Sequence, residues 1–136
     1  MKATLPFLLL ATMLFAAVPA YAGHFETGEE AYQKGDYTTA FQEYKTAAEN
    51  GDPRAQGKLA ALYLYGRGTS VDYGKAYLWF EMAARQGDEF AARFRDAAAA
   101  RLTVEELQRL NDQLGEYARK YVDPYKEENK PKEGAN

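Results

Sequence analysis

Side chains that could perform catalysis are scarce in this chain. Its 136 residues include no cysteine and a single histidine, His24. The chain therefore lacks a thiol nucleophile and the ligands of a zinc site built from cysteine and histidine. We expect His24 to lie in a short lead, residues 23–26, outside any helix and without a neighbouring nucleophile to activate. These features predict a protein that is not an enzyme and has no metal site.

Two pairs of adjacent carboxylates could act as a general acid and a general base. The pairs are Glu29-Glu30 and Glu105-Glu106. Each pair stands where we expect the first turn of a helix, and the positive end of the helix dipole favours negative charge there. We therefore interpret both pairs as helix-capping residues.

The segment Gly66-Arg67-Gly68 has a superficial likeness to a phosphate-binding loop. Such a loop follows a strand and ends in Gly-Lys-Ser or Gly-Lys-Thr, and this segment has neither feature. We interpret its glycines as the means of making a tight turn between two helices. The sequence therefore predicts no nucleotide and no other cofactor.

The charge balance argues against nucleic acid as a partner, since the chain is acidic, with a formal net charge of −3, and lacks a basic stripe. Five arginines nevertheless gather in its second half: Arg85, Arg93, Arg95, Arg101 and Arg109. Because charges of both signs are interspersed, we favour a solvated, ion-paired face over contact with an acidic partner or an anionic glycan. The acids available for pairing are Glu89, Asp96, Glu105 and Glu106.

The first 22 residues have the pattern of an export signal. Lys2 supplies a charged start, residues 5–18 are almost wholly apolar, and Ala20-Tyr21-Ala22 places small residues where a signal peptidase reads them. We expect cleavage at about Ala22 and a periplasmic or secreted protein whose formal net charge, without Lys2, is −4. The alternative is an uncleaved membrane anchor, since about 20 apolar residues span a bilayer.

The remaining chain contains an internal repeat with a period of 36 residues. The segment Ala47-Ala48-Glu49-Asn50-Gly51-Asp52 recurs as Ala83-Ala84-Arg85-Gln86-Gly87-Asp88. The same offset relates Asp36-Tyr37 to Asp72-Tyr73, at positions that suit a helix start. A period in this range is typical of helical repeat proteins.

Capping residues predict six helices after the export segment. A capping box of Thr27 and Glu30 would open the first, and one of Thr103 and Glu106 the sixth. The expected helices cover about residues 27–34, 36–50, 52–65, 72–87, 88–101 and 103–122. The sixth has an apolar stripe at helical spacing: Val104, Leu107, Leu110, Leu114, Tyr117 and Tyr121. We expect an all-α, short right-handed α-solenoid of about six antiparallel helices, followed by disorder over residues 123–136.

A longer set of spaced residues carries a family resemblance. The set is Ala55, Leu59, Tyr63, Gly66, Gly68, Asp72, Lys75-Ala76, Trp79-Phe80, Ala83-Ala84, Gly87 and Ala91. It resembles the Sel-one-like repeat, a relative of the tetratricopeptide repeat. The resemblance implies a repeat domain over 27–122, made of a degenerate unit at 27–51, a full unit at 52–87 and capping helices at 88–122. It also implies a binding scaffold, since similar proteins act as adaptors for larger complexes, in bacteria often at the cell envelope.

In repeats of this kind the first helix of each pair lines a concave surface. On the third expected helix, Arg54, Lys58, Ala61 and Tyr65 share the face that the repeat pattern leaves free. One period later stand Phe90, Phe94, Ala97 and Arg101. The predicted partner-binding residues are Arg54, Lys58, Tyr65, Phe90, Phe94 and Arg101. The two phenylalanines form either a hydrophobic partner site or a surface buried under the sixth helix, and we favour burial.

The expected function is therefore protein–protein interaction. We expect a monomer or weak dimer that acts as an adaptor or assembly factor and binds a peptide, loop or helix of an envelope protein. Contact with a membrane is expected only through an uncleaved export segment. The alternative is an envelope protein that binds peptidoglycan or a polysaccharide, with tyrosines stacked on sugar rings and arginines facing carboxylates.

Overall fold

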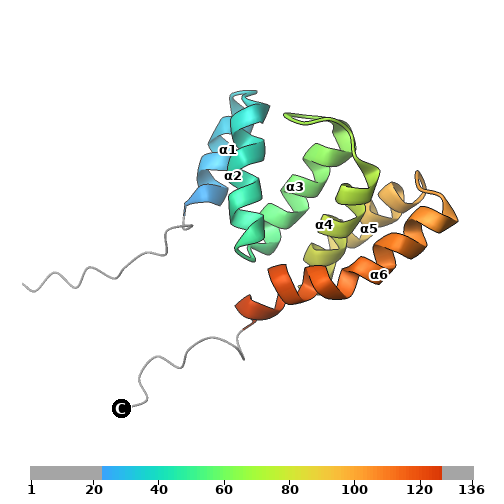
Figure 1. Ribbon diagram of the computed structural model, residues 1–136. Helices are drawn as coiled ribbons and strands as arrows, with labels where there is room; N and C mark the ends of the chain where they lie inside the picture. Colours follow the sequence, from blue (N-terminus) through green and yellow to red (C-terminus); the bar gives the residue numbers. More distant parts are fainter. Residues whose placement is uncertain (1–22, 127–136) are drawn as a thin grey trace, which may run out of the picture.

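The computed structural model describes residues 23–126, which contain helices and no strand (Figure 1). The elements are α1 (His24–Gln33), α2 (Tyr37–Glu49), α3 (Pro53–Tyr65), α4 (Tyr73–Arg85), α5 (Glu89–Ala99), α6 (Val104–Tyr121) and the 3₁₀-helix η1 (Asp123–Tyr125). The predicted all-α solenoid of about six helices is confirmed. The predicted export segment, residues 1–22, and residues 127–136 of the predicted disordered tail lie outside the described residues.

Aspartates begin the four central helices, as the repeat predicts. Asp36, Asp52, Asp72 and Asp88 each accept a hydrogen bond from a backbone N–H in the first turn of α2, α3, α4 and α5. Each bond satisfies one of the amides that a helix start leaves unpaired. The capping box of Thr103 and Glu106 also forms at the start of α6, as predicted.

Helix α1 begins earlier than predicted. It starts at His24 after Gly23, and the amide of Thr27 donates to the carbonyl of Gly23 inside the helix, so the expected capping box of Thr27 and Glu30 does not form. Contacts with α2 hold this extra turn, because His24 bonds Glu43 and the ring of Phe25 packs on that of Tyr44. The predictions of a lead at residues 23–26 and of a non-helical His24 are therefore wrong.

The chain also remains ordered beyond its last predicted helix. Val122 is buried, and Tyr125 in η1 packs against the start of the α2–α3 turn. A Cβ on Gly51 would lie only 2.2 Å from the ring of Tyr125, and the Tyr125 hydroxyl donates to the carbonyl of Glu49 at 3.3 Å. The predicted disorder is therefore wrong for residues 123–126, because the Tyr125 ring packs against the backbone at Gly51.

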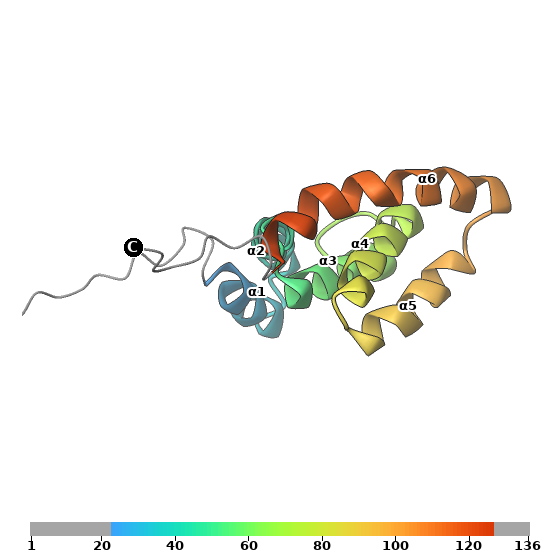
Figure 2. The ribbon, with the colours of Figure 1, turned by 90° about the horizontal axis from the view of Figure 1, so that it is seen from below.

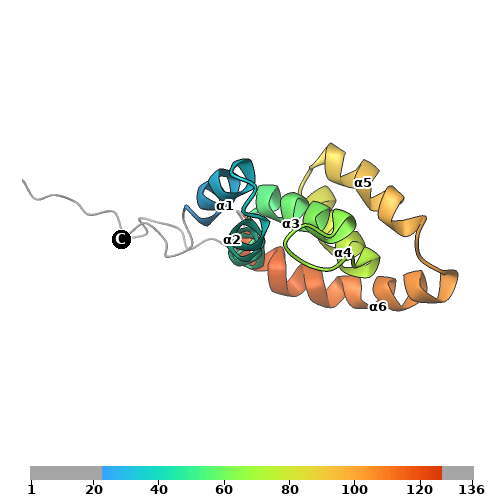
Figure 3. The same ribbon diagram turned by 90° about the horizontal axis from the view of Figure 1, so that it is seen from above.

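The helices stack as pairs, and the last helix crosses the stack. Helices α1 and α2, and then α3 and α4, form antiparallel pairs, and α5 packs on α4 (Figure 1). Instead of pairing with α5, α6 runs back over α4 towards α2, so that α4 lies between α5 and α6 (Figures 2 and 3). Helices α1, α3 and α5 are thus left facing the other side of the molecule.

The path of α6 is explained by the residues that it covers. Trp79 of α4 is buried, and its ring lies 5.9 Å from that of Tyr117 and 4.9 Å from that of Tyr121, between centroids. Leu114 and Ala118 are also buried in this contact. Most of the predicted apolar stripe on α6 faces the core, whereas Val104 at its start is 72% exposed.

Candidate binding groove

Two adjoining cavities lie on the side of the molecule formed by α1, α3 and α5. The first, the α3/α5 pocket, has a volume of about 220 Å³ and is lined by Arg54, Gly57, Lys58, Ala61, Tyr65, Phe80, Asp88, Phe90, Ala91 and Phe94. The second, the α1/α3 pocket, measures about 260 Å³ and is lined by Tyr32, Lys58, Ala61, Leu62, Tyr65 and Arg67. Three residues of α3 line both, so the pockets form one concave groove.

The structure brings five of the six predicted partner-binding residues together. Arg54, Lys58, Tyr65, Phe90 and Phe94 all line the α3/α5 pocket. The helical spacing on α3 and its counterpart one period later on α5 explain this convergence, since equivalent faces of successive first helices point the same way. Their role in binding stays a prediction.

The expectation that α6 buries the two phenylalanines is wrong. Phe90 is 71% exposed and Phe94 is 41% exposed. Because α6 packs on α4 opposite α5, it leaves this face of α5 open. Phe94 stacks on the buried Phe80, with ring centroids 5.8 Å apart and planes at 20°. This stacking holds the Phe94 ring in place at the edge of the pocket.

Side chains of α1 position the basic residues of α3. The Arg54 guanidinium lies 4.0 Å from the centre of the Phe25 ring and pairs with Asp52 at 2.7 Å and Glu26 at 3.4 Å. Lys58 Nζ lies 2.9 Å from Glu29 Oε1. The sequence did not predict this role of α1. The first unit is degenerate, so the 36-residue repeat does not indicate which residues of α1 lie next to those of α3.

Glu29 links the groove to the core, and its interpretation as a capping residue is wrong. It lies in the middle of α1, where the buried Tyr44 donates its hydroxyl hydrogen bond to the Glu29 carboxylate. Burial alone would raise the pKa of Glu29, but the hydrogen bonds from Tyr44 and Lys58 and the charges of Lys58 and Arg54 hold it below its usual value. Glu29 is therefore a charged acceptor that fixes Lys58 in place.

Arg67, in the loop that superficially resembles a phosphate-binding loop, lines the groove. Its Nη1 donates to the Tyr32 hydroxyl at 2.5 Å, and its guanidinium lies 5.3 Å from the ring centre of Tyr37. Gly68 brings the loop against α2, since a Cβ there would lie 2.0 Å from the Tyr37 carbonyl oxygen. Arg67 has no carboxylate partner among residues 23–126.

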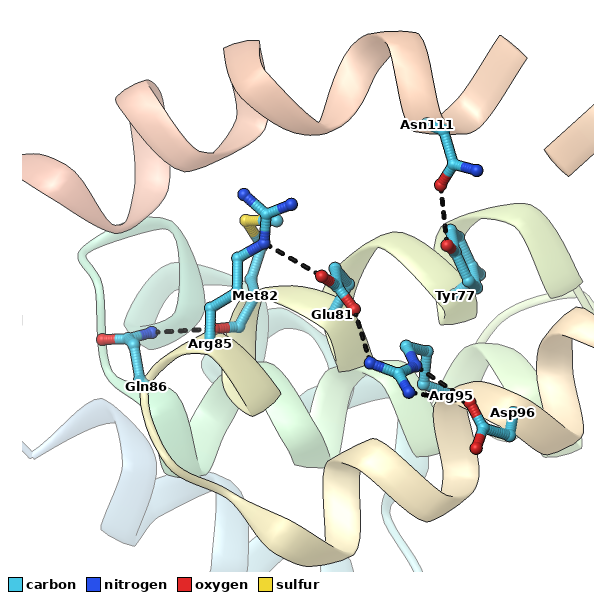
Figure 4. A network of polar contacts seen from close by, with 8 residues as sticks. All are labelled: Tyr77, Glu81, Met82, Arg85, Gln86, Arg95, Asp96 and Asn111. Carbon is cyan, nitrogen blue, oxygen red and sulfur yellow. Dashed lines mark hydrogen bonds and ion pairs between the residues drawn. The ribbon is translucent and has the colours of Figure 1, made fainter. Parts of the chain in front are cut away.

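Some of the clustered arginines are ion-paired (Figure 4). Glu81 of α4 accepts from Arg85 at 2.9 Å and from Arg95 of α5 at 2.9 Å, and Arg95 also pairs with Asp96. Of the acids expected to pair with these arginines, Asp96 pairs with Arg95, whereas the main carboxylate partner, Glu81, was not among them. Together with a 2.8 Å hydrogen bond from Tyr77 to Asn111, these contacts tie α4 to α5 and α6.

The sixth predicted site residue, Arg101, lies outside the groove. Its Nη2 donates to the Tyr73 hydroxyl at 2.8 Å, and its guanidinium lies 5.0 Å from the centre of that ring. It lines a third cavity, of about 420 Å³, with Val71, Asp72, Tyr73, Gly74, Leu102, Glu106, Arg109, Leu110 and Gln113. Helix α5 ends at Ala99, so Arg101 does not continue the helix face that carries Phe90 and Phe94 to the α3/α5 pocket.

Two further features bear on the type of site. Within residues 23–126, no group of three or more His, Asp or Glu side chains is arranged to hold a metal ion. None of the helices in this range is both long and apolar enough to cross a bilayer.

Comparison with known proteins agrees with the predicted repeat. The model of the Sel1 repeat matches residues 20–52 and 53–88, which together make up half of the chain. The second match agrees closely with the full unit predicted at 52–87. Sel1 repeats are helical scaffolds that generally mediate protein–protein interaction.

A solved structure also has a similar fold. It is the crystal structure of c5321, a protective antigen present in uropathogenic Escherichia coli strains displaying an SLR fold, with 30% sequence identity and a TM-score of 0.69. The similarity covers 75% of this chain and 23% of c5321. No curated protein matches the sequence. From its repeats and its fold, the chain belongs to the Sel1 repeat family.

Proposed function

We propose that this protein is an exported adaptor that binds a peptide, loop or helix of an envelope protein in its concave groove. The observation that carries the proposal is the exposure of three aromatic side chains around the α3/α5 pocket: Tyr65 of α3, and Phe90 and Phe94 of α5. Clustered exposed aromatic side chains with a polar rim are typical of protein interaction surfaces.

The size and composition of the groove favour a protein ligand. Each of its two adjoining pockets, of about 220 and 260 Å³, has room for a single side chain of a partner. Tyr65 is exposed between them, and Arg54 and Lys58 border the apolar surface. Tyrosine and arginine are the residue types that dominate the energy of many interfaces.

The proposed location follows from the first 22 residues. Their charged start, apolar stretch and Ala20-Tyr21-Ala22 end favour export and cleavage at about Ala22. The absence of cysteine is compatible with an oxidising compartment, because the helical core needs no disulfide to hold it.

The test is crosslinking in native cells, followed by affinity purification of the full chain through a C-terminal tag and mass spectrometry. We expect one dominant envelope protein and a mature amino terminus at about Gly23. The double variant Lys58→Ala/Tyr65→Ala should lose this partner while keeping its helical circular dichroism, and Val104→Ala, exposed on α6, should retain it. If the double variant retains the partner, the groove is not the binding site.

A second candidate function, binding of an acidic cell-wall glycan, is supported by the third cavity. Arg101 and Arg109 could face a carboxylate there, and Tyr73 offers a ring beside them. Sedimentation of the protein with purified peptidoglycan tests this function. Glycan binding predicts that the protein co-sediments, that Arg101→Ala abolishes co-sedimentation, and that Lys58→Ala/Tyr65→Ala does not affect it. An adaptor that binds a protein should stay in the supernatant.

A further inference from the structure

We infer that the groove selects a partner segment with one aromatic side chain close in sequence to two or more carboxylates. The inference rests on the proposed function and adds the chemistry of the partner. The aromatic side chain would fill the α3/α5 pocket, and the carboxylates would lie over the α1/α3 pocket.

The α3/α5 pocket has the shape and surface of a socket for one ring. The stacked rings of Phe94 and Phe80 form one wall, and Ala61 and Ala91 are too small to fill the space between α3 and α5. Gly57 also lines the pocket and lets α3 approach the start of α5 closely, since a Cβ there would lie 3.3 Å from the Asp88 carboxylate. An inserted aromatic ring would gain both the burial of its own surface and stacking on Phe94.

The α1/α3 pocket is positively charged. Its lining contains Lys58 and Arg67 and no carboxylate. Glu29, outside the lining, neutralises Lys58, whereas the Arg67 guanidinium lies beside Tyr32 and Tyr37 and has no carboxylate partner within residues 23–126. A guanidinium fixed in this way can donate to a carboxylate in a bidentate manner at little cost in side-chain entropy.

One extended segment can reach both pockets. Lys58, Ala61 and Tyr65 line both pockets, so the two pockets are separated only by the side chains of α3. Tyr65 stands on this shared wall, and its hydroxyl has no hydrogen-bond partner within the described part of the chain. It is therefore free to donate to a carboxylate or a backbone carbonyl of the partner.

The test measures the anisotropy of fluorescein-labelled peptides with the full chain. The probe peptide has one tryptophan two residues from a run of three glutamates in a Gly-Ser background. In one control peptide alanine replaces the tryptophan, and in another lysines replace the glutamates. We expect each control to bind about tenfold more weakly or worse. Binding of the probe should also weaken as salt rises, because the charge contacts are exposed to solvent.

Groove variants assign each preference to its pocket. Arg67→Ala should remove most of the preference for glutamate over lysine, and Arg119→Ala, an exposed arginine of α6 that lines neither pocket, should leave it intact. Phe94→Ala should remove the preference for tryptophan over alanine, with Val104→Ala as its control. Circular dichroism establishes that each variant is folded, and Arg67→Lys, which keeps the charge, should restore part of the glutamate preference.

Two results would overturn the inference. One is equal binding of all three peptides, and the other is a glutamate preference that survives Arg67→Ala. If native crosslinking still captures a partner that depends on Lys58 and Tyr65, the inference fails while the groove keeps its proposed function. If no partner depends on those residues, the proposed function itself fails.

Discussion

Lys58 Nζ lies 2.9 Å from Glu29 Oε1, and this contact joins the first helix of one repeat to the first helix of the next across the groove. The same carboxylate accepts a hydrogen bond from the buried Tyr44 of α2. One acidic side chain thus connects the core, α1 and the binding surface. The groove is therefore preformed, which lowers the conformational cost of binding a partner.

Removing the Tyr44 hydroxyl should destabilise the protein. Tyr44→Phe keeps the ring but removes a hydrogen bond to a charged acceptor, and we expect the free energy of unfolding to fall by about 1–2 kcal/mol. Urea denaturation followed by circular dichroism measures the change. Tyr63→Phe is the matched control, since the hydroxyl of Tyr63 has no hydrogen-bond partner within residues 23–126, and equal losses in the two variants would contradict the role of Glu29 as acceptor.

The contribution of Glu29 to stability should depend on pH. Its pKa is lower in the folded chain than the ordinary value of 4.5, so its contribution is present above pH 4.5 and is lost as the pH falls through the folded-state pKa. Compared with Glu29→Gln, the native chain should be more stable at pH 7 by less than about 1 kcal/mol, because the ion pair is partly solvated. Urea denaturation of both proteins at pH 7 and pH 3 should show this difference vanish in acid, whereas a constant difference would contradict it.

The packing of α6 on Trp79 provides an optical test of the fold. Leu114→Ala removes a buried side chain beside this contact and should lower the free energy of unfolding by about 2–4 kcal/mol. Val104→Ala, on the same helix but exposed, should change it by less than about 0.5 kcal/mol. Because Trp79 is the only tryptophan in the sequence, its emission should shift to the red if α6 is loosened. Unchanged stability in Leu114→Ala would contradict the placement of α6.

A buried glutamine should fix the far end of α6. Gln56 is fully buried, donates to the carbonyls of Ala48 and Tyr121 at 3.2 and 3.0 Å, and accepts from Gln86 at 2.6 Å. Gln56→Leu leaves these groups unpaired, and we expect a loss of about 1–3 kcal/mol. Hydrogen exchange at the C-terminal end of α6 should quicken in this variant and not in Gln42→Leu, whose side chain is exposed. Equal exchange rates in the two variants would contradict the anchoring role.

Local signals in the sequence predicted the positions of most helices. The aspartates at positions 36, 52, 72 and 88 mark helix starts because capping involves only the next few residues. The shared face of Arg54, Lys58 and Tyr65 also follows from helical spacing alone. These features depend on short-range geometry, which is the kind that a repeat offset reveals.

Long-range contacts were the part that the sequence did not predict. Helix α6 could cover either Phe90 of α5 or Trp79 of α4. Both are large apolar residues at helical spacing, so the sequence pattern does not distinguish the two arrangements. The bracing of Lys58 by Glu29 depends on where α1 lies relative to α3, and the degenerate first unit carries no spacing signal for it. The binding surface was thus located to the correct helix faces, while its exposure and its support came from the tertiary structure.

The groove as the partner-binding surface is tested most directly by photo-crosslinking in native cells. The photoreactive residue p-benzoylphenylalanine would replace Tyr65, on the wall shared by both pockets, or Glu116, exposed on α6. We predict that position 65 yields a crosslink to one protein partner and that position 116 does not. A crosslink from position 116 alone, or from neither position, would contradict binding in the groove.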